Sequence, residues 1–335
     1  MIKWGILGCG KIARKFASDL TLVPQAKLCA IASRNRENAN AFAAEFGAEK
    51  IFYQYEELAE CNDVDVIYIA TPHALHYENT MLCLQHNKAV LCEKAFAMNA
   101  SQAALMIAEA QSRNVFLMEA MWTKFLPNYN KLISLLREGF IGEVQSLLID
   151  FGFRAEQPPS GRLLNPALGG GTLLDIGVYN VFMALSILGM PENIEAHASL
   201  SGQGTDEQCA VLFKYSNGVM AQLFSTFRSN TPTVCSIGGT KGRLHITHRF
   251  YTPFARIEYY PATPDTKQIL YSGENEKGWG YHYQAAHVCE CLEKGLTQSP
   301  VMRHADTLQL MNTLDAIRKI AGIRYEEDEG IAISY

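Results

Sequence analysis

The chain has 335 residues, which is too long for one ordinary hydrophobic core, so we expect two domains. Apolar residues make up 48% of it and charged residues 19%, as in a soluble globular protein. The net charge of −5, without a dense Lys/Arg cluster, argues against nucleic acid as a partner, and no apolar run is expected to span a membrane.

The cysteines and the N-terminus indicate the compartment. The 9 cysteines lack the spacing of a disulfide framework, so we expect reduced thiols in a cytoplasmic protein. The sequence enters a predicted strand at once, and no signal peptide is expected. His73 and His76 are spaced like half a metal site, but no carboxylate or thiol of suitable spacing accompanies them, so no metal is expected.

The first predicted elements are a strand at residues 2–7, a glycine turn and a helix. The turn has a G-x-G-x-x-A pattern formed by Gly8, Gly10 and Ala13. In such a turn the first glycine permits the tight bend, the second lets the backbone approach a pyrophosphate, and the small third residue lets helix and strand pack closely. An ordinary structural turn is the alternative. The pattern predicts a dinucleotide at the helix N-terminus, with contacts from Gly8, Gly10, Lys11 and Ile12.

The end of the second predicted strand, residues 27–32, bears on the choice of cofactor. Sites selective for NAD place Asp or Glu there to hold the ribose 2′-hydroxyl. This chain has Ser33 and Arg34 instead, and a hydroxyl with a guanidinium can bind a 2′-phosphate. The two residues favour NADP(H), with NAD(H) as the other cofactor that the turn would accept. The alternative is that Ser33 and Arg34 only begin a solvated loop.

Strands and helices continue to alternate as far as residue 121. Further strands are predicted at 64–70, 89–93 and 115–119, and helices at 36–46, 76–86 and 101–113. This order predicts a Rossmann domain over residues 1–121, with a doubly wound parallel α/β sheet that binds its ligand at the carboxyl ends of the strands. The candidate cofactor residues at these ends are Thr71, Pro72, His73, His76, Glu93 and Lys94.

From residue 122 to 335 the pattern is that of an α+β domain. It contains predicted helices at 128–138 and 173–188, a strand at 144–151, a Gly/Pro-rich stretch at 158–171, and strand-like runs at 194–201, 209–215, 219–227, 234–238, 243–247 and 256–260. Asn217-Gly218 and Lys241-Gly242 indicate hairpins and therefore a mostly antiparallel sheet. A sheet with one exposed face must be covered, and a homodimer is the expected cover.

Three residues suit proton transfer. Lys94 follows a strand at the ligand edge, where its charge can lower the pKa of a neighbouring acid and polarise a substrate oxygen. Asp175 and Tyr179 follow three glycines and lie four residues apart, on one face of the expected helix. A tyrosine beside a cation can relay a proton to or from a hydroxyl. The structural alternative is a solvated lysine, an Asp that caps a turn and a Tyr in the core.

Together these motifs resemble the Gfo/Idh/MocA family of oxidoreductases along essentially the full chain. The resemblance is to its branch of dimeric dihydrodiol dehydrogenases and NADP-dependent D-xylose dehydrogenases, on the strength of residues 91–94 and 117–123. It implies an open-faced second sheet used for dimerisation and a catalytic pair of Lys94 and Tyr179. It also implies that Asp175 lies beside the reacting hydroxyl and that Trp122 and Phe151 shape the substrate pocket. Ala95 replaces the proline usual after the Glu-Lys pair, so this backbone is expected to be less constrained.

The resemblance implies hydride transfer between NADP(H) and a CH–OH or carbonyl group of a sugar, a polyol or a trans-dihydrodiol. Two other functions stay open: reduction of another small carbonyl compound, and a non-catalytic NADP(H)-binding sensor of the same fold. The lysine and tyrosine argue against the sensor, which has no need of a proton relay.

Overall fold

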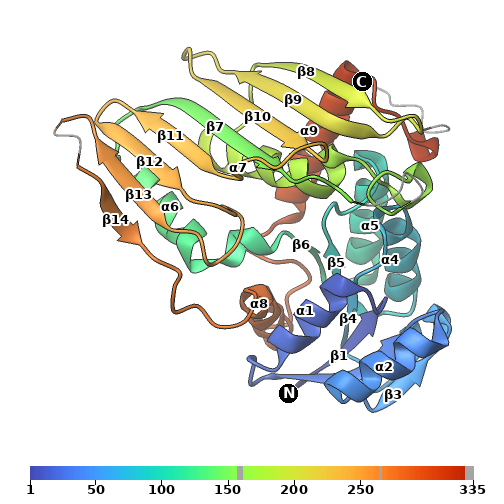
Figure 1. Ribbon diagram of the computed structural model, residues 1–335. Coiled ribbons are helices and arrows are strands. Elements are labelled where there is room, and N and C mark those ends of the chain that lie inside the picture. Colours follow the sequence, from blue (N-terminus) through green and yellow to red (C-terminus); the bar gives the residue numbers. More distant parts are fainter. Residues whose placement is uncertain (157–160, 264–265, 329–335) are drawn as a thin grey trace. The chain divides into compact units, whose positions relative to one another are not determined.

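The computed structural model describes residues 1–156, 161–263 and 266–328 (Figure 1). Residues 158–160 of the Gly/Pro-rich stretch therefore lie outside the described residues. The chain forms two compact units, of which the first is Met1–Phe125 with Lys277–Met311, and the second is Leu126–Glu276 with Asn312–Tyr335. The expected division at residue 121 differs from this one, because it assigned 277–311 to the second domain.

The first unit is built on a parallel sheet of six strands in the order β3-β2-β1-β4-β5-β6, the arrangement of a Rossmann fold. Its strands are β1 (Ile2–Leu7), β2 (Ala26–Ala32), β3 (Lys50–Phe52), β4 (Val66–Ile69), β5 (Ala89–Glu93) and β6 (Leu117–Ala120). Its helices include α1 (Lys11–Leu20), α2 (Arg36–Phe46), α3 (Tyr55–Ala59), α4 (His76–Gln85) and α5 (Ala100–Arg113). The Rossmann prediction is confirmed; β3 and α3 were not predicted, since three- and five-residue elements carry little periodicity.

Burial on both faces explains why the strands of the first unit are continuously apolar. All four residues of β4 are buried, and helices cover the sheet (Figure 1). The apolar side of α1 packs on this sheet through Phe16, whose ring stacks on Tyr68 of β4 at 3.8 Å between centroids and lies 5.3 Å from Trp4 of β1. The turn at Gly8 is thereby held between a fixed strand and a fixed helix.

A contact remote in sequence explains why 277–311 belongs to the first unit. Asp19 on α1 is fully buried, and its carboxylate accepts hydrogen bonds from the backbone N–H of Trp279 at 2.8 Å and of Tyr281 at 2.7 Å. These residues lead into α8 (Tyr281–Glu293), which has no side-chain cap of its own at Gly280. The carboxylate thus caps α8 across the fold, and no local pattern in the sequence announces it.

The second unit contains a sheet of eight strands in the order β14-β13-β12-β11-β7-β10-β9-β8. The strands are β7 (Val144–Gly152), β8 (Asn193–Leu200), β9 (Asp206–Lys214), β10 (Met220–Thr226), β11 (Cys235–Gly239), β12 (Gly242–Ile246), β13 (Ile257–Pro261) and β14 (Gln268–Tyr271). The antiparallel pairs β9–β10 and β11–β12 confirm the two predicted hairpins, and β7–β10 is a parallel pair. The α+β prediction is confirmed; β14 was not predicted.

Helices cover one face of this sheet, among them α6 (Pro127–Arg137) and α7 (Val178–Leu188), while α9 (His304–Ala321) is divided between the units (Figure 1). The predicted helix 173–188 begins instead as a π-helix, Leu173–Gly177, and becomes α-helical as α7. The segment Pro166–Leu188, with a mean hydropathy of 1.6, is long and apolar enough to cross a membrane, contrary to our expectation. Because 78% of its apolar window is buried inside the fold, it is a core segment.

Candidate functional site

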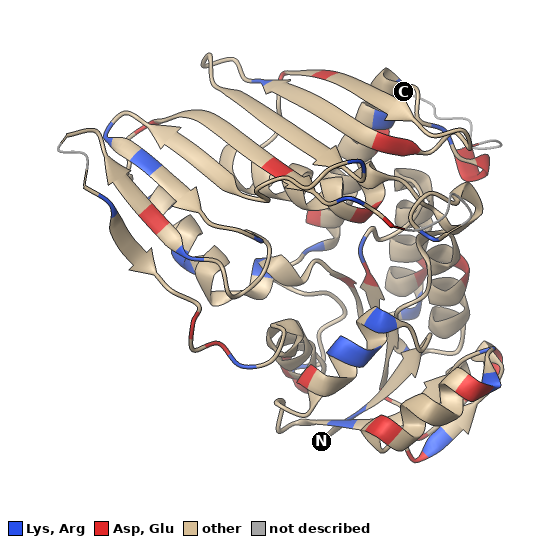
Figure 2. Cartoon of the chain, in the orientation of Figure 1, with Lys and Arg blue, Asp and Glu red and all other residues tan. Residues whose placement is uncertain are grey.

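The glycine turn has the geometry of a pyrophosphate site. Gly8 has φ +96°, and a Cβ there would lie 3.0 Å from the carbonyl oxygen of Ala70. A Cβ on Gly10 would meet no described atom within 4 Å, so the space beside this backbone is open. Gly10 precedes α1 without capping it by a side chain, which leaves first-turn N–H groups to a ligand. Basic residues also gather on α1 (Figure 2). The residues present therefore fit a dinucleotide.

Ser33 and Arg34 lie where β2 ends, on the same sheet edge as the turn. Ser33 is buried, and its N–H donates to Phe52 at 3.1 Å. The exposed Arg34 guanidinium lies 5.1 Å from the ring centroid of Tyr55. Asn35 caps α2 by accepting from the N–H of Asn38 at 2.9 Å, so the loop is well fixed.

The residues after β4 form a buried brace. His76 is fully buried, and its two ring nitrogens lie 2.9 Å from Thr71 O and 2.8 Å from Ala95 O. Burial lowers the pKa of His76 to about 4, so the ring is neutral at physiological pH. The ring of His73 meets it edge to face at 5.6 Å. A neutral ring has one N–H, so His76 donates to one of these two carbonyls and packs against the other, and it does not present its ring to the ligand edge.

Lys94 follows β5 and is followed by a cis peptide bond to Ala95. The expectation of a looser backbone at Ala95 is not met, since the residue is fully buried and its carbonyl oxygen lies 2.8 Å from a ring nitrogen of the buried His76. Glu93 is also buried; it accepts a hydrogen bond from the Tyr68 hydroxyl, and its second oxygen accepts from the N–H of Lys94 at 3.3 Å. Glu93 thus orients the strand end that carries the lysine.

A second buried carboxyl, Glu119, lies on the neighbouring strand. It accepts a hydrogen bond from Thr307 at 2.8 Å, and its other oxygen has no hydrogen-bond partner among the residues that the structure describes. Burial raises the pKa of Glu119 to about 7, against the opposing effects of Thr307 and Lys124. The sequence indicated no such group, because a single Glu in an apolar strand forms no pattern.

In the second unit the π-helix presents Asp175. Its carboxylate accepts from both terminal nitrogens of Arg162, at 3.3 and 3.2 Å. The start of this helix is fixed by the fully buried Asp206, which accepts from the hydroxyl of Thr172 and from the N–H of Leu173 at 2.7 Å. Burial raises the pKa of Asp206 to about 6.

Tyr179 and Phe151 meet in an aromatic cluster of the second unit. Their ring centroids are 6.0 Å apart, and Tyr251 stacks on Phe151 at 4.5 Å and lies 4.9 Å from Tyr179. Burial raises the pKa of Tyr251, against the opposing charge of Arg249 and with a smaller contribution from the charge of Asp175. Tyr251 therefore joins the two predicted residues, although no sequence signal marked it.

The other predicted substrate residue, Trp122, lies in the first unit and stacks on Tyr281 at 4.4 Å. Lys94 also belongs to the first unit, while Asp175, Tyr179 and Phe151 belong to the second. Within the described ranges 1–156, 161–263 and 266–328, no group of three or more His, Cys, Asp or Glu could hold a metal ion.

A Rossmann sheet with an open glycine turn, in a chain with a second α+β unit, defines a two-domain protein of the dinucleotide-binding class. Residues 2–121 match the family described as "Oxidoreductase family, NAD-binding Rossmann fold", and residues 129–245 match its "GFO/IDH/MocA C-terminal domain". The chain belongs to the Gfo/Idh/MocA family, and it is a dehydrogenase.

Three relatives illustrate the similarity. The chain is 37% identical to the trans-1,2-dihydrobenzene-1,2-diol dehydrogenase of Xenopus tropicalis, over 96% of this chain and 99% of that one. A 3-ketoreductase from Actinomadura kijaniata, solved with NADP and TDP-benzene, has a TM-score of 0.85 and 27% identity, over 96% and 98% of the two chains. Levoglucosan dehydrogenase with NADH and levoglucosan has a TM-score of 0.83 at 21% identity, over 96% and 97%, and shows the fold alone.

Proposed function

We propose that this protein transfers a hydride between NADP(H) and a CH–OH or carbonyl group of a sugar, polyol or trans-dihydrodiol. The observation that carries the proposal is the open backbone at Gly10 at the ligand edge of the sheet, together with Lys94 at the same edge. The identity of 37% to a trans-dihydrodiol dehydrogenase over nearly the whole chain supports the substrate class.

The cofactor is held by Gly8, Gly10, Lys11, Ile12, Ser33, Arg34, Thr71, Pro72, His73, Glu93 and Lys94, with His76 acting indirectly as a brace. When bound, the nicotinamide supplies the hydride acceptor or donor. Ser33 and Arg34, without a carboxylate at the end of β2, support a preference for the 2′-phosphate of NADP(H). The complex of NADP with the 3-ketoreductase from Actinomadura kijaniata is consistent with that preference.

The side chains of the protein, and not the cofactor, provide the proton transfer. In the oxidising direction the substrate C–OH would lose its proton to the phenolate oxygen of Tyr179, while the hydrogen of its C–H bond would leave as a hydride to the bound nicotinamide and a C=O bond would form. The ammonium of Lys94 stabilises the negative charge on the tyrosine and on the developing carbonyl oxygen. Asp175 accepts a hydrogen bond from the substrate, and Trp122 and Phe151 provide apolar walls for its C–H groups. Of the solved relatives, the 3-ketoreductase has been studied with a lysine changed to alanine and with a tyrosine changed to phenylalanine, which supports roles for these residue types.

A screen at the NADPH absorbance tests the activity with aldoses and trans-dihydrodiols. Lys94→Ala and Tyr179→Phe are expected to lower kcat by about 100- to 10,000-fold. The matched controls are Lys294→Ala and Tyr259→Phe, which remove the same groups elsewhere and keep wild-type rates. Tight NADP(H) binding without turnover of any polyol or carbonyl compound would instead favour the sensor.

Cofactor preference has its own test. Arg34→Gln is expected to lower kcat/KM for NADP by about 10- to 100-fold and to leave NAD almost unaffected, since NAD lacks the 2′-phosphate that the guanidinium is proposed to bind. Arg113→Gln, at the distant end of α5, is the control. An equal loss with both cofactors would contradict the preference.

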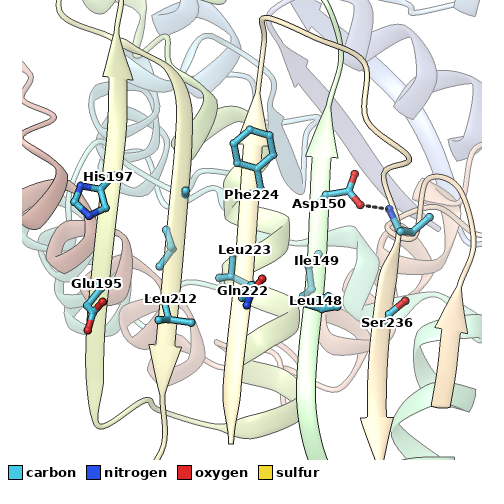
Figure 3. Close-up of a pocket in the computed structure, with 13 residues that line it drawn as sticks. Leu148, Ile149, Asp150, Glu195, His197, Leu212, Gln222, Leu223, Phe224 and Ser236 are labelled. Carbon is cyan, nitrogen blue, oxygen red and sulfur yellow. Dashed lines mark hydrogen bonds between the residues drawn. The ribbon is translucent and has the colours of Figure 1, made fainter. Parts of the chain in front are cut away.

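We also propose a homodimer through the uncovered face of the second sheet. Figure 3 shows Leu148, Leu212 and Phe224 pointing to this face among polar side chains such as Glu195 and His197. Leu148 is 49% exposed, and a face with such residues is suited to a second copy. Light scattering should give twice the mass of one chain, and Leu148→Asp should give a monomer. Leu105→Asp, on α5 of the first unit, should leave the dimer intact.

A further inference from the structure

The bidentate contact between Arg162 and Asp175 joins a residue of the proposed mechanism to an arginine to which that mechanism gives no role. Both terminal nitrogens of the guanidinium donate to the carboxylate, at 3.3 and 3.2 Å. The two partners differ in exposure: 11% for the side chain of Asp175 and 45% for that of Arg162. The Asp175 end of the pair is therefore buried, and the Arg162 end is accessible to a molecule in solution.

The backbone around Arg162 is fixed against the start of the π-helix. The N–H of Gly171 donates to Leu163 O at 2.8 Å, and the N–H of Gly170 donates to Asn165 O at 2.9 Å. A Cβ on Gly170 would lie 2.9 Å from Arg162 O and 2.8 Å from Leu163 O, so only a glycine permits this approach. The glycines thus place Arg162 beside Asp175, and the pair is a built feature of the fold.

The pair offers acceptors and donors side by side. A guanidinium has five N–H groups, of which Asp175 takes two, and a carboxylate oxygen accepts more than one hydrogen bond. A single hydroxyl would use only one member of the pair. Two hydroxyls on adjacent carbons match both members, since one donates to the carboxylate and the other accepts from the guanidinium.

We propose that Arg162 is a specificity-determining residue that, with Asp175, recognises two adjacent hydroxyl groups of the substrate. This inference rests on the proposed function and assigns to Arg162 the discrimination between its vicinal-diol substrates and mono-alcohols. The course of the chain supports it, because Asp175 lies in the π-helix Leu173–Gly177, which continues directly as α7, and Tyr179 is the second residue of α7. The pair is therefore carried by the same continuous helical segment as the tyrosine that is proposed to transfer the proton.

The test compares each substrate with its counterpart that lacks the neighbouring hydroxyl: trans-cyclohexane-1,2-diol with cyclohexanol, and D-xylose with 2-deoxy-D-xylose. Wild type should prefer the diol in kcat/KM. Arg162→Ala should reduce that preference by about 10- to 100-fold, mainly through KM for the diol, and added guanidinium ion should restore part of it. Arg162→Lys, which keeps one donor group, should show a preference for the diol between those of wild type and Arg162→Ala. The control Arg137→Ala, at the exposed end of α6, should show the wild-type preference.

Titration of the same compounds onto the protein saturated with NADP(H) measures the preference without turnover. Melting temperatures and NADP(H) affinity of the Arg162 variants are expected to match wild type, which separates recognition from a purely structural role. An unchanged preference in Arg162→Ala would overturn the inference, and so would an equal loss for the diol and the mono-alcohol. Failure of wild type to turn over any compound would instead count against the proposed function, and the titration would still decide the role of Arg162.

Discussion

Removal of the Asp19 carboxylate should release the segment that leads into α8. The carboxylate is fully buried and accepts two short hydrogen bonds, from Trp279 N–H at 2.8 Å and Tyr281 N–H at 2.7 Å. Hydrogen bonds to a charged group contribute about 1.5–3 kcal/mol each. Water will satisfy part of the freed donors, because Trp279 is 44% exposed. We therefore expect Asp19→Ala to lower the free energy of unfolding of the first unit by about 3–5 kcal/mol.

Calorimetry should record this loss as a fall in Tm of roughly 6–20 °C, at about 2–4 °C per kcal/mol for units of this size. Asp19→Asn keeps one acceptor oxygen and should cost about 1–2 kcal/mol. Glu290→Ala, on the exposed side of α8, is the matched control and should stay within about 0.5 kcal/mol. Amide hydrogen exchange should accelerate first at residues 279–282. If Asp19→Ala leaves both the Tm and this exchange unchanged, the cap contributes nothing and the explanation of the domain boundary is wrong.

Three further predictions concern Glu119, Gly10 and the cysteines. Burial raises the pKa of Glu119 from 4.5 to about 7, so its stabilising effect is complete below 4.5 and is lost as the pH rises through 7. Urea titrations should then show wild type losing up to about 3 kcal/mol relative to Glu119→Gln between about pH 5 and pH 8, and parallel curves would contradict this. Gly10→Ala should keep the wild-type Tm but weaken NADP(H) binding at least about tenfold. Fluorescence titration measures the affinity, with Gly202→Ala as the control variant. An unchanged affinity would exclude a pyrophosphate site at this turn. The 9 cysteines are all buried, and burial raises the pKa of Cys9 to about 11, so a thiol reagent should modify them only after unfolding; rapid reaction of the native protein would refute this.

The first unit could be predicted closely because its signals are local. A buried parallel strand is a continuous apolar run, and helices such as α2 begin at a capping Asn and end at a glycine, so Arg36–Phe46 was predicted with its observed bounds. The domain boundary could not be predicted, since it depends on Asp19 meeting residues 279–282, more than 250 positions away along the chain. Nothing in either segment identifies the other.

The candidate site was predictable only as far as each residue lies in a motif. Lys94, Asp175 and Tyr179 stand in motifs, whereas Arg162 and Tyr251, which contact Asp175 and Tyr179 within the second unit, lie in loops of irregular conformation. The expected helical face of Asp175 and Tyr179 also assumed an α-helix, and Asp175 lies in a π-helix instead. Each of them meets a partner that the spacing did not indicate: Asp175 accepts from Arg162, and the ring of Tyr179 lies 4.9 Å from that of Tyr251.

The glycine clusters at residues 8–10 and 169–171 look alike in sequence but have different roles. Both precede a helix, and both suggested a backbone that something approaches closely. The surroundings of an added Cβ distinguish them: at Gly10 it would meet no described atom within 4 Å, whereas at Gly170 it would lie 2.8–2.9 Å from the backbone of residues 162, 163 and 165. A ligand needs empty space beside the glycine backbone, as at Gly10. At Gly170 that space is already occupied by other backbone atoms of the protein. The first cluster therefore serves the cofactor, and the second serves Arg162, the residue on which the choice of substrate is proposed to depend.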